Sequence, residues 1–157
     1  MLLFLKILPF IVTALIIVLG YYTNDKKRKN KHFKDDESQI EYYKSIYIPI
    51  KFDRRLPTIK KNGYKLEDIA ENATIFCYDN PIPSKDEISK LKAGDLVKLN
   101  FVDKNHEVER MWVRYEKYDT GLHLGILDND PFDINKLEIG AEVWFHSNNI
   151  LIIDDKE

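Results

Sequence analysis

The amino-terminal stretch from Leu2 to Tyr22 is the strongest constraint on what this chain can fold into. Between Leu2 and Gly20, fourteen residues are Leu, Ile, Val or Phe. As an α-helix, residues 2–22 would extend roughly 31 Å, which is close to the hydrocarbon thickness of a membrane. These side chains together favour insertion by very roughly 4 to 8 kcal/mol. The sequence therefore predicts a transmembrane helix over residues 1–22.

The residues inside and after this stretch favour an uncleaved anchor over a secretory signal peptide. Lys6 lies within about one turn of the helix end, from where its ammonium group can reach the headgroups. Pro9 falls near the start, where a helix tolerates proline best. Tyr21 and Tyr22 suit the membrane interface. They also stand where signal peptidase would need small residues, so we expect the segment to remain attached.

A basic segment follows the apolar stretch and predicts the orientation of the chain. Residues 26–34 carry six Lys or Arg, whereas only Lys6 and the amino terminus precede the span. Positive charge is retained on the cytoplasmic side of the plasma membrane. We therefore expect a flexible basic linker over residues 23–38 and a cytoplasmic carboxyl-terminal domain over residues 39–157, with the lipid bilayer as a partner.

The charge of the remaining chain argues against a nucleic-acid partner. Residues 38–157 hold 17 basic and 22 acidic side chains, a net charge of −5, whereas nucleic-acid binders usually carry a basic excess. Cys77 is the only cysteine, so the chain has neither an intramolecular disulfide nor a multi-cysteine zinc site. Its apolar surroundings predict a small buried side chain. No motif predicts a cofactor.

The rest of the sequence predicts short strands with tight turns and few helices. Ser84 and Glu87 match a capping box, so a helix is expected over residues 85–92. Another short helix is expected over residues 66–73. Alternating apolar residues predict that three side chains of each of four strands face inward. The expected strands are residues 40–52, 74–78, 95–102, 107–118, 122–127, 141–146 and 150–153. The expected inward residues are Val97, Leu99 and Phe101; Met111, Val113 and Tyr115; Leu122, Leu124 and Ile126; and Ala141, Val143 and Phe145.

This order of elements is typical of an α+β, mainly β domain. Pro49 would place the first strand at an edge or bend, and the later strands follow one another at short spacing. We expect a small, partly open SH3-like barrel or meander with one or two short helices, in addition to the transmembrane helix.

Several ordered short stretches resemble one bacterial family. They are LKAGDLVKLNF, ERMWV, GILDNDPF and LEIGAEVWFHSNNI, and they are similar to the domain of unknown function 2314, or YegJ-like, family over about residues 84–153. The resemblance implies a small accessory or membrane-linked bacterial protein with no assigned activity and no catalytic residues to carry over. The turn residues 127–131 depart from the expected pattern by carrying additional negative charge.

A stripe of arginine and tryptophan is the strongest candidate for a binding site. Period two places Arg110, Trp112 and Arg114 on the face of their strand opposite Met111 and Val113. Trp144 falls on the corresponding face of a later strand. Such residues anchor peptides, sugars or anionic ligands. The alternative is that residues 40–80 cover this face and bury both tryptophans.

The acidic turn and the histidines are weaker candidates for a metal site. The stretch after Gly125 fails the EF-hand pattern at every later ligand position, although a weak cation site from Asp128, Asp130 and Asp133 stays open. His106, His123 and His146 show no zinc-binding spacing, and His123 and His146 are expected on outward faces.

The sequence favours a single-pass membrane-anchored accessory protein with a non-enzymatic interaction domain that binds a protein partner. A metal-dependent enzyme that uses the histidines and the acids of residues 128–133 is one alternative, although the chain carries no recognisable enzyme signature. A toxin-neutralising or structural protein is the other.

Overall fold

The computed structural model describes residues 33–134 and 136–154. The predicted anchor over residues 1–22 and most of the predicted linker lie outside the described residues. Within them, no helix is both long and apolar enough to cross a bilayer. The first described helix, α2 (Asp36–Ile46), already begins within the range assigned to the linker.

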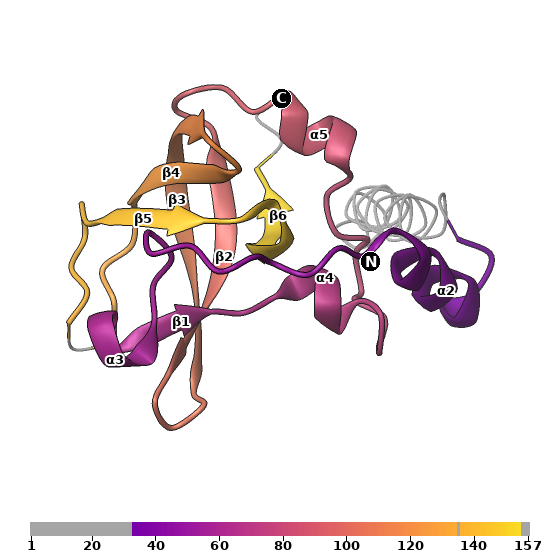
Figure 1. Ribbon diagram of the computed structural model, residues 1–157, viewed down its shortest axis with the longest axis horizontal. Coiled ribbons are helices and arrows are strands. Elements are labelled where there is room, and N and C mark those ends of the chain that lie inside the picture. The colour runs from indigo at the N-terminus through magenta and orange to yellow at the C-terminus, as the bar shows by residue number, and fades with distance from the viewer. Residues whose placement is uncertain (1–32, 135, 155–157) are drawn as a thin grey trace, which may run out of the picture.

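Six antiparallel strands form one sheet in the described part of the chain (Figure 1). The order is β1-β2-β3-β4-β5, and β6 pairs with β2 beside β1. The sheet curls into an open half-barrel, which confirms the mainly β class. The finer assignment to an SH3-like barrel stays a prediction. The strands are β1 (Tyr64–Leu66), β2 (Leu96–Asp103), β3 (Val108–Asp119), β4 (Leu122–Leu127), β5 (Glu142–Phe145) and β6 (Ile150–Ile153).

The concave side of the sheet holds the core. Leu99 pairs with Met111 and Val97 with Val113 across β2 and β3, and all four side chains are buried. Val143 and Phe145 complete the set from β5. These residues confirm the predicted inward faces of β2, β3 and β5, because an antiparallel pair places directly opposed residues on one face.

Strand β4 faces the opposite way from the prediction. Gly125 pairs with both Tyr115 and Val143, and Leu127 pairs with Val113, so Gly125 and Leu127 belong to the inward face. His123, opposite Phe145, joins them. The prediction that Leu122, Leu124 and Ile126 point inward was therefore wrong. The cause is that Leu122 and Leu124 are buried on the outer face, and alternation is ambiguous in a strand covered on both sides.

The predicted strand over residues 40–52 was also wrong, because α2 occupies most of it. Asp35 accepts a bond from the Ser38 amide, and the Ser38 hydroxyl accepts one from the Asp35 amide, which forms a capping box. Acidic residues in the first turn and Lys44 in the last suit the helix dipole. The helix buries Gln39 and Tyr43, a spacing of four that the tyrosine- and isoleucine-rich pattern masked.

The remaining helices are short. The predicted strand over residues 74–78 is instead a turn segment with Ile75 and Phe76 exposed. The capping box of Ser84 and Glu87 is present, but α5 ends at Ser89, earlier than expected. The other elements are α3 (Ile59–Asn62), α4 (Ile69–Asn72), α5 (Lys85–Ser89) and the 3-10 helix η1 (Ser147–Asn149).

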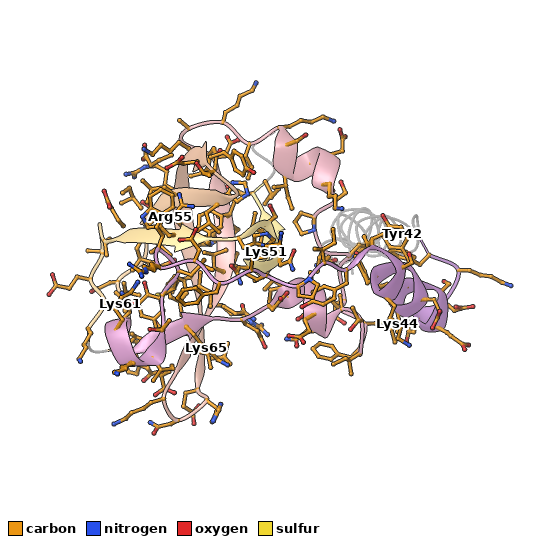
Figure 2. The ribbon with its side chains drawn as sticks, viewed as in Figure 1. Tyr42, Lys44, Lys51, Arg55, Lys61 and Lys65 are labelled. Atoms are coloured by element: carbon orange, nitrogen blue, oxygen red, sulfur yellow. The ribbon has the colours of Figure 1, made fainter. Side chains whose placement is uncertain are left out.

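Residues 47–58, which we call the strap, lead from α2 to α3 and run beside β5 (Figure 1). Arg55 fastens the strap by donating to the Asp119 and Thr120 carbonyls, each at 3.1 Å. The same guanidinium forms an ion pair with Asp53. Its Cζ atom lies 4.8 Å from the ring centroid of Trp144, and Figure 2 shows the Arg55 side chain. Arg55 therefore connects the strap both to the turn after β3 and to the outer face of β5.

We expect Gly125→Ala to destabilise the domain strongly. The added Cβ would lie 2.5 Å from Val113 Cγ1 and 2.7 Å from the Arg114 carbonyl oxygen. Overpacking of this kind costs about 1–3 kcal/mol. Urea unfolding followed by tryptophan fluorescence measures the loss. Gly121→Ala is the control, because its Cβ meets open space and costs only backbone strain. An equal loss in both variants would contradict the close approach of β3 and β4.

Candidate functional site

Arg110 and Trp112 lie on the outer face of β3, as predicted. Arg110 is exposed and Trp112 is half-buried. The ammonium nitrogen of Lys98, directly opposite on β2, lies 4.2 Å from the Trp112 ring centroid. The Trp112 amide donates to the side-chain oxygen of Asn129. The indole therefore lies against a cation, the turn bonds the main chain of Trp112, and part of the side chain is open to solvent.

Arg114 is already engaged by acids. Its Nη1 lies 3.3 Å from an oxygen of Asp128, and its Nε lies 3.6 Å from an oxygen of Glu116. All three side chains are more than a third exposed, so these ion pairs contribute little to stability. A ligand carboxylate at Arg114 would have to displace one of them. The charge of Arg114 is thus already paired with acids of this chain and is not free for a ligand.

Trp144 shares the outer face with Trp112 but lies far from it. Trp144 of β5 pairs with Leu124 of β4. Trp112 of β3 instead lies opposite Asp128, which follows the other end of β4 and donates its amide to the Trp112 carbonyl. Two strand spacings and four residues along the sheet separate them by roughly 16 Å. Arg55 of the strap covers one tryptophan and Lys98 the other. The four predicted residues therefore lie on one face without forming a single platform.

The acidic turn after β4 runs along the free edge of β3. The Asp128 amide donates to the Trp112 carbonyl at 2.9 Å. Farther on, the carboxylate of Glu109 accepts bonds from the amides of Phe132, at 2.8 Å, and Asp133, at 3.2 Å. The turn is thus fastened at both ends, yet the Phe132 side chain is 89% exposed. Sequence reasoning missed Phe132, because an aromatic residue in a turn does not by itself reveal its exposure.

The metal-site candidates do not come together. His106 lies in the β2–β3 turn, and His123 starts β4, whereas Asp128 and Asp130 follow the other end of that strand. His146 caps η1 by accepting a bond from the Asn148 amide. Among the described residues, no three His, Cys, Asp or Glu side chains are placed to share a metal ion.

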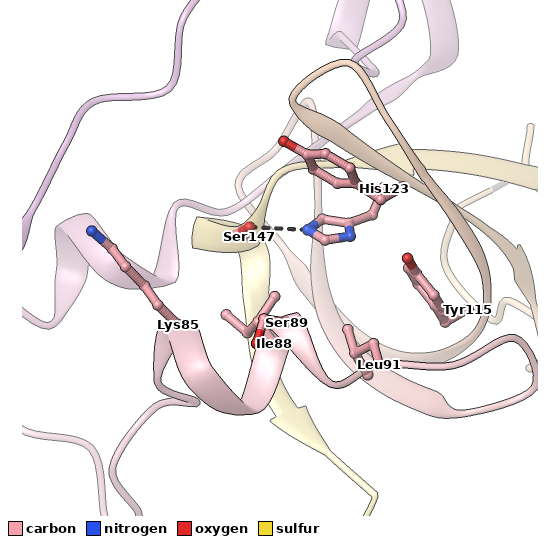
Figure 3. Close-up of a pocket in the computed structure, with 8 residues that line it drawn as sticks. Lys85, Ile88, Ser89, Leu91, Tyr115, His123 and Ser147 are labelled. Atoms are coloured by element: carbon pink, nitrogen blue, oxygen red, sulfur yellow. Dashed lines mark hydrogen bonds between the residues drawn. The ribbon is translucent and has the colours of Figure 1, made fainter.

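A pocket at the opposite end of β3 contains the residue that sequence reasoning misplaced most. His123 is only 4% exposed and lies between α5 and the β3–β4 hairpin. Its Nε2 is 2.9 Å from Ser147 Oγ (Figure 3). The ring of Phe145 stacks on the imidazole, with the ring centroids 5.2 Å apart. The prediction that His123 points outward was wrong, because it depended on the inverted face of β4.

The His123–Ser147 pair suits binding better than nucleophilic catalysis. Burial lowers the pKa of His123 from 6.5 to about 4, so the imidazole is neutral near pH 7 and is a weak base. The Nδ1 atom is buried without a hydrogen-bond partner in the described part of the chain, whereas a catalytic histidine is oriented through that nitrogen. The pair therefore provides a fixed polar group in an aromatic wall.

We expect the free energy of unfolding to fall as the pH is lowered from about 6.5 to about 4. In this window the unfolded chain protonates His123 and the folded chain does not, since the folded pKa is about 4. The loss amounts to up to about 3 kcal/mol at 1.36 kcal/mol per pKa unit. Urea unfolding at several pH values measures it. His123→Leu should flatten the dependence, and His106→Asn, in an exposed turn, should not. An unchanged slope in His123→Leu would refute this assignment.

Comparison with known proteins identifies the family. A family model described as an uncharacterised protein conserved in bacteria, DUF2314, matches residues 71–154. The match extends the resemblance seen in the sequence and includes β2 to β6, the pocket and the outer face of β3. Searches of curated proteins and of solved structures found no match. With more than half of its length matched, the chain belongs to the DUF2314 family of bacterial proteins.

Proposed function

We propose that this chain is a single-pass membrane-anchored accessory protein whose β-rich domain binds a protein partner without catalysing a reaction. The single observation that carries the proposal is the pinned turn that exposes Phe132 beside the start of β3, the strand that carries Arg110 and Trp112. We call these three residues the β3 corner. A binding domain needs a fixed surface that presents apolar side chains and a charged group to its partner. The β3 corner presents aromatic side chains and the charge of Arg110.

The exposed aromatic ring is the first argument. Phe132 is 89% exposed although Glu109 and the Trp112 strand hold its turn in place. Burial of such a side chain against a partner contributes about 1.5–3 kcal/mol. Because the backbone is already ordered, little conformational entropy is lost on binding. Trp112 and Arg110 belong to the residue types that dominate binding energies at interfaces.

Charge is the second argument and indicates the chemistry of the partner. Residues 38–157 carry a net charge of −5, but Lys98 and Arg110 lie side by side on the outer face. Neither forms an ion pair with another described residue within 4.0 Å. These two cations therefore attract acidic groups, while the whole domain repels polyanions such as nucleic acid. The partner we infer is a protein segment that presents an apolar side chain beside acidic residues.

The amino-terminal sequence supports the membrane part of the proposal. The apolar stretch over residues 1–22 has the length and composition of a spanning helix, and six basic residues follow it at residues 26–34. This order favours a cytoplasmic domain held within a short linker of the inner face of the plasma membrane. Tethering raises the effective concentration of the domain toward partners in the same membrane.

We expect Phe132→Ala and Arg110→Glu to weaken capture of the partner by at least about tenfold, as loss of an interface anchor does. Crosslinking in native membranes, followed by affinity purification of the full chain and blue-native electrophoresis, measures the complex. Phe52→Ala is the matched control, because Phe52 is 86% exposed but lies in the strap. Equal capture by Phe132→Ala, Arg110→Glu and Phe52→Ala would overturn the β3 corner as the contact. Mass spectrometry of the captured protein distinguishes an accessory role from a toxin-neutralising one.

We expect a fluorescent reporter fused after Glu157 to be active and an alkaline phosphatase fused there to be inactive. The physical reason is that basic residues next to a span are retained in the cytoplasm. Replacement of Lys26, Lys27, Arg28 and Lys29 by Gln should weaken this orientation. Strong phosphatase activity of the unaltered fusion would show that the domain is outside the cytoplasm.

A further inference from the structure

We propose that the pocket between α5 and the β3–β4 hairpin binds a small carboxylate with an aromatic or branched apolar body. The pocket has a volume of about 350 Å³, at the lower end of the range for small-molecule sites. It lies at the opposite end of β3 from the β3 corner, so the inference goes beyond the proposed protein contact and does not depend on it.

The aromatic and aliphatic side chains that line the pocket indicate what the apolar part of the ligand must be. Tyr115 and Tyr118 place their ring centroids 5.7 and 5.2 Å from that of His123. Ile88 and Leu91 line the side formed by α5 and the residues after it (Figure 3). The amides of Gly94 and Tyr115 form backbone bonds of 2.8 Å that hold this segment against β3. A flat or branched apolar group would therefore contact aromatic and aliphatic surfaces held in fixed positions.

The charge of the lining selects an anion. Lys85, at the edge of the pocket, is the charged residue of the lining, which includes no Asp or Glu. Nearby acids of α5 are already engaged: Asp86 pairs with Lys90 at 2.6 Å, and Glu87 accepts bonds from Ser84. The charge of Lys85 is therefore poorly compensated, and a carboxylate at the edge would be attracted to it.

Polar groups deeper in the pocket supply a second contact. Ser147 Oγ is held at 2.9 Å from His123 Nε2. His123 Nδ1 is buried and has no partner among the described residues, which is a costly state for a polar atom. With Nε2 accepting from the Ser147 hydroxyl, Nδ1 carries the proton and can donate to a carboxylate oxygen that reaches it. The lining thus combines an apolar body site with one cationic and two polar groups, the pattern typical of sites for small organic acids.

The test uses phenylacetate with the full chain in nanodiscs. We expect a dissociation constant of about 1 mM for a ligand of this size. A saturable change in the NMR chemical shift of the His123 imidazole reports binding at the pocket. A rise in the Tm of the protein reports binding independently. Phenylacetamide and 2-phenylethylamine, which share the ring but lack the anion, should bind at least about threefold to tenfold more weakly.

Variants connect the signal to the pocket. Lys85→Gln should weaken phenylacetate binding, whereas Lys92→Gln, an exposed lysine outside the lining, should not. Ile88→Trp should fill the pocket and abolish binding while circular dichroism shows an intact fold. The proposal is overturned if the His123 resonance shows no saturable shift up to about 10 mM. It is also overturned if the amide binds as well as the acid, or if Lys85→Gln and Ile88→Trp bind like the unaltered chain.

Discussion

The close contact of β3 and β4 at Gly125 is the constraint on which the rest of the domain depends. Val113 Cγ1 occupies the space where a side chain at position 125 would begin. Because Gly125 faces inward, His123 and Leu127 must also face inward, and Leu122 and Leu124 must face the other side. The outer face of β4 is then apolar, and Leu122 and Leu124 are buried there, next to the turn that the strap contacts. Arg55 fastens that strap to the turn between β3 and β4.

The same contact creates the pocket. An irregularity between Tyr115 and Lys117 leaves one extra residue on β3, so Tyr115 and Tyr118 both approach His123. A bulge of this kind changes the direction of side chains without breaking the sheet. The imidazole is thereby placed among aromatic rings, where burial keeps it neutral near pH 7. One irregular position in β3 therefore connects the packing of the barrel with the polar group of the proposed ligand site.

Strand β3 connects the two proposed sites. At its start, Arg110 and Trp112 lie beside the turn that carries Phe132, and near its end Tyr115 and Tyr118 line the pocket. The two ends also differ in chemistry, since the β3 corner offers exposed rings and cations whereas the pocket offers a narrow enclosed surface. Strand pairing holds both ends of β3, the start against β2 and the end against β4, which suits a domain that recognises two unlike ligands.

Local sequence patterns determined much of this architecture. The strands from β2 to β6 were predictable because their residues alternate and their turns are rich in Asp, Asn and Gly. The start of α5 was predictable from the spacing of Ser84 and Glu87 alone. The outward position of Arg110, Trp112 and Arg114 also followed from period two. The wrong strand over residues 40–52 shows the limit, because Asp35 and Ser38 form a cap that the isoleucines and tyrosines obscured.

Tertiary structure alone decided which face of β4 is inward, what lies on each tryptophan and where a pocket opens. Alternation gathers Leu122, Leu124 and Ile126 on one face of β4, so the local pattern indicated the wrong face, and the decision depends on the contact between Gly125 and Val113. Arg55 reaches Trp144 across 89 positions of sequence, and Ser147 reaches His123 across 24. Contacts of that range depend on how the strands curl and pair, whereas the apolar stretch, the basic segment and the turns depend only on neighbouring residues. The sequence therefore determined the elements and their order, and the curvature of the sheet determined the sites.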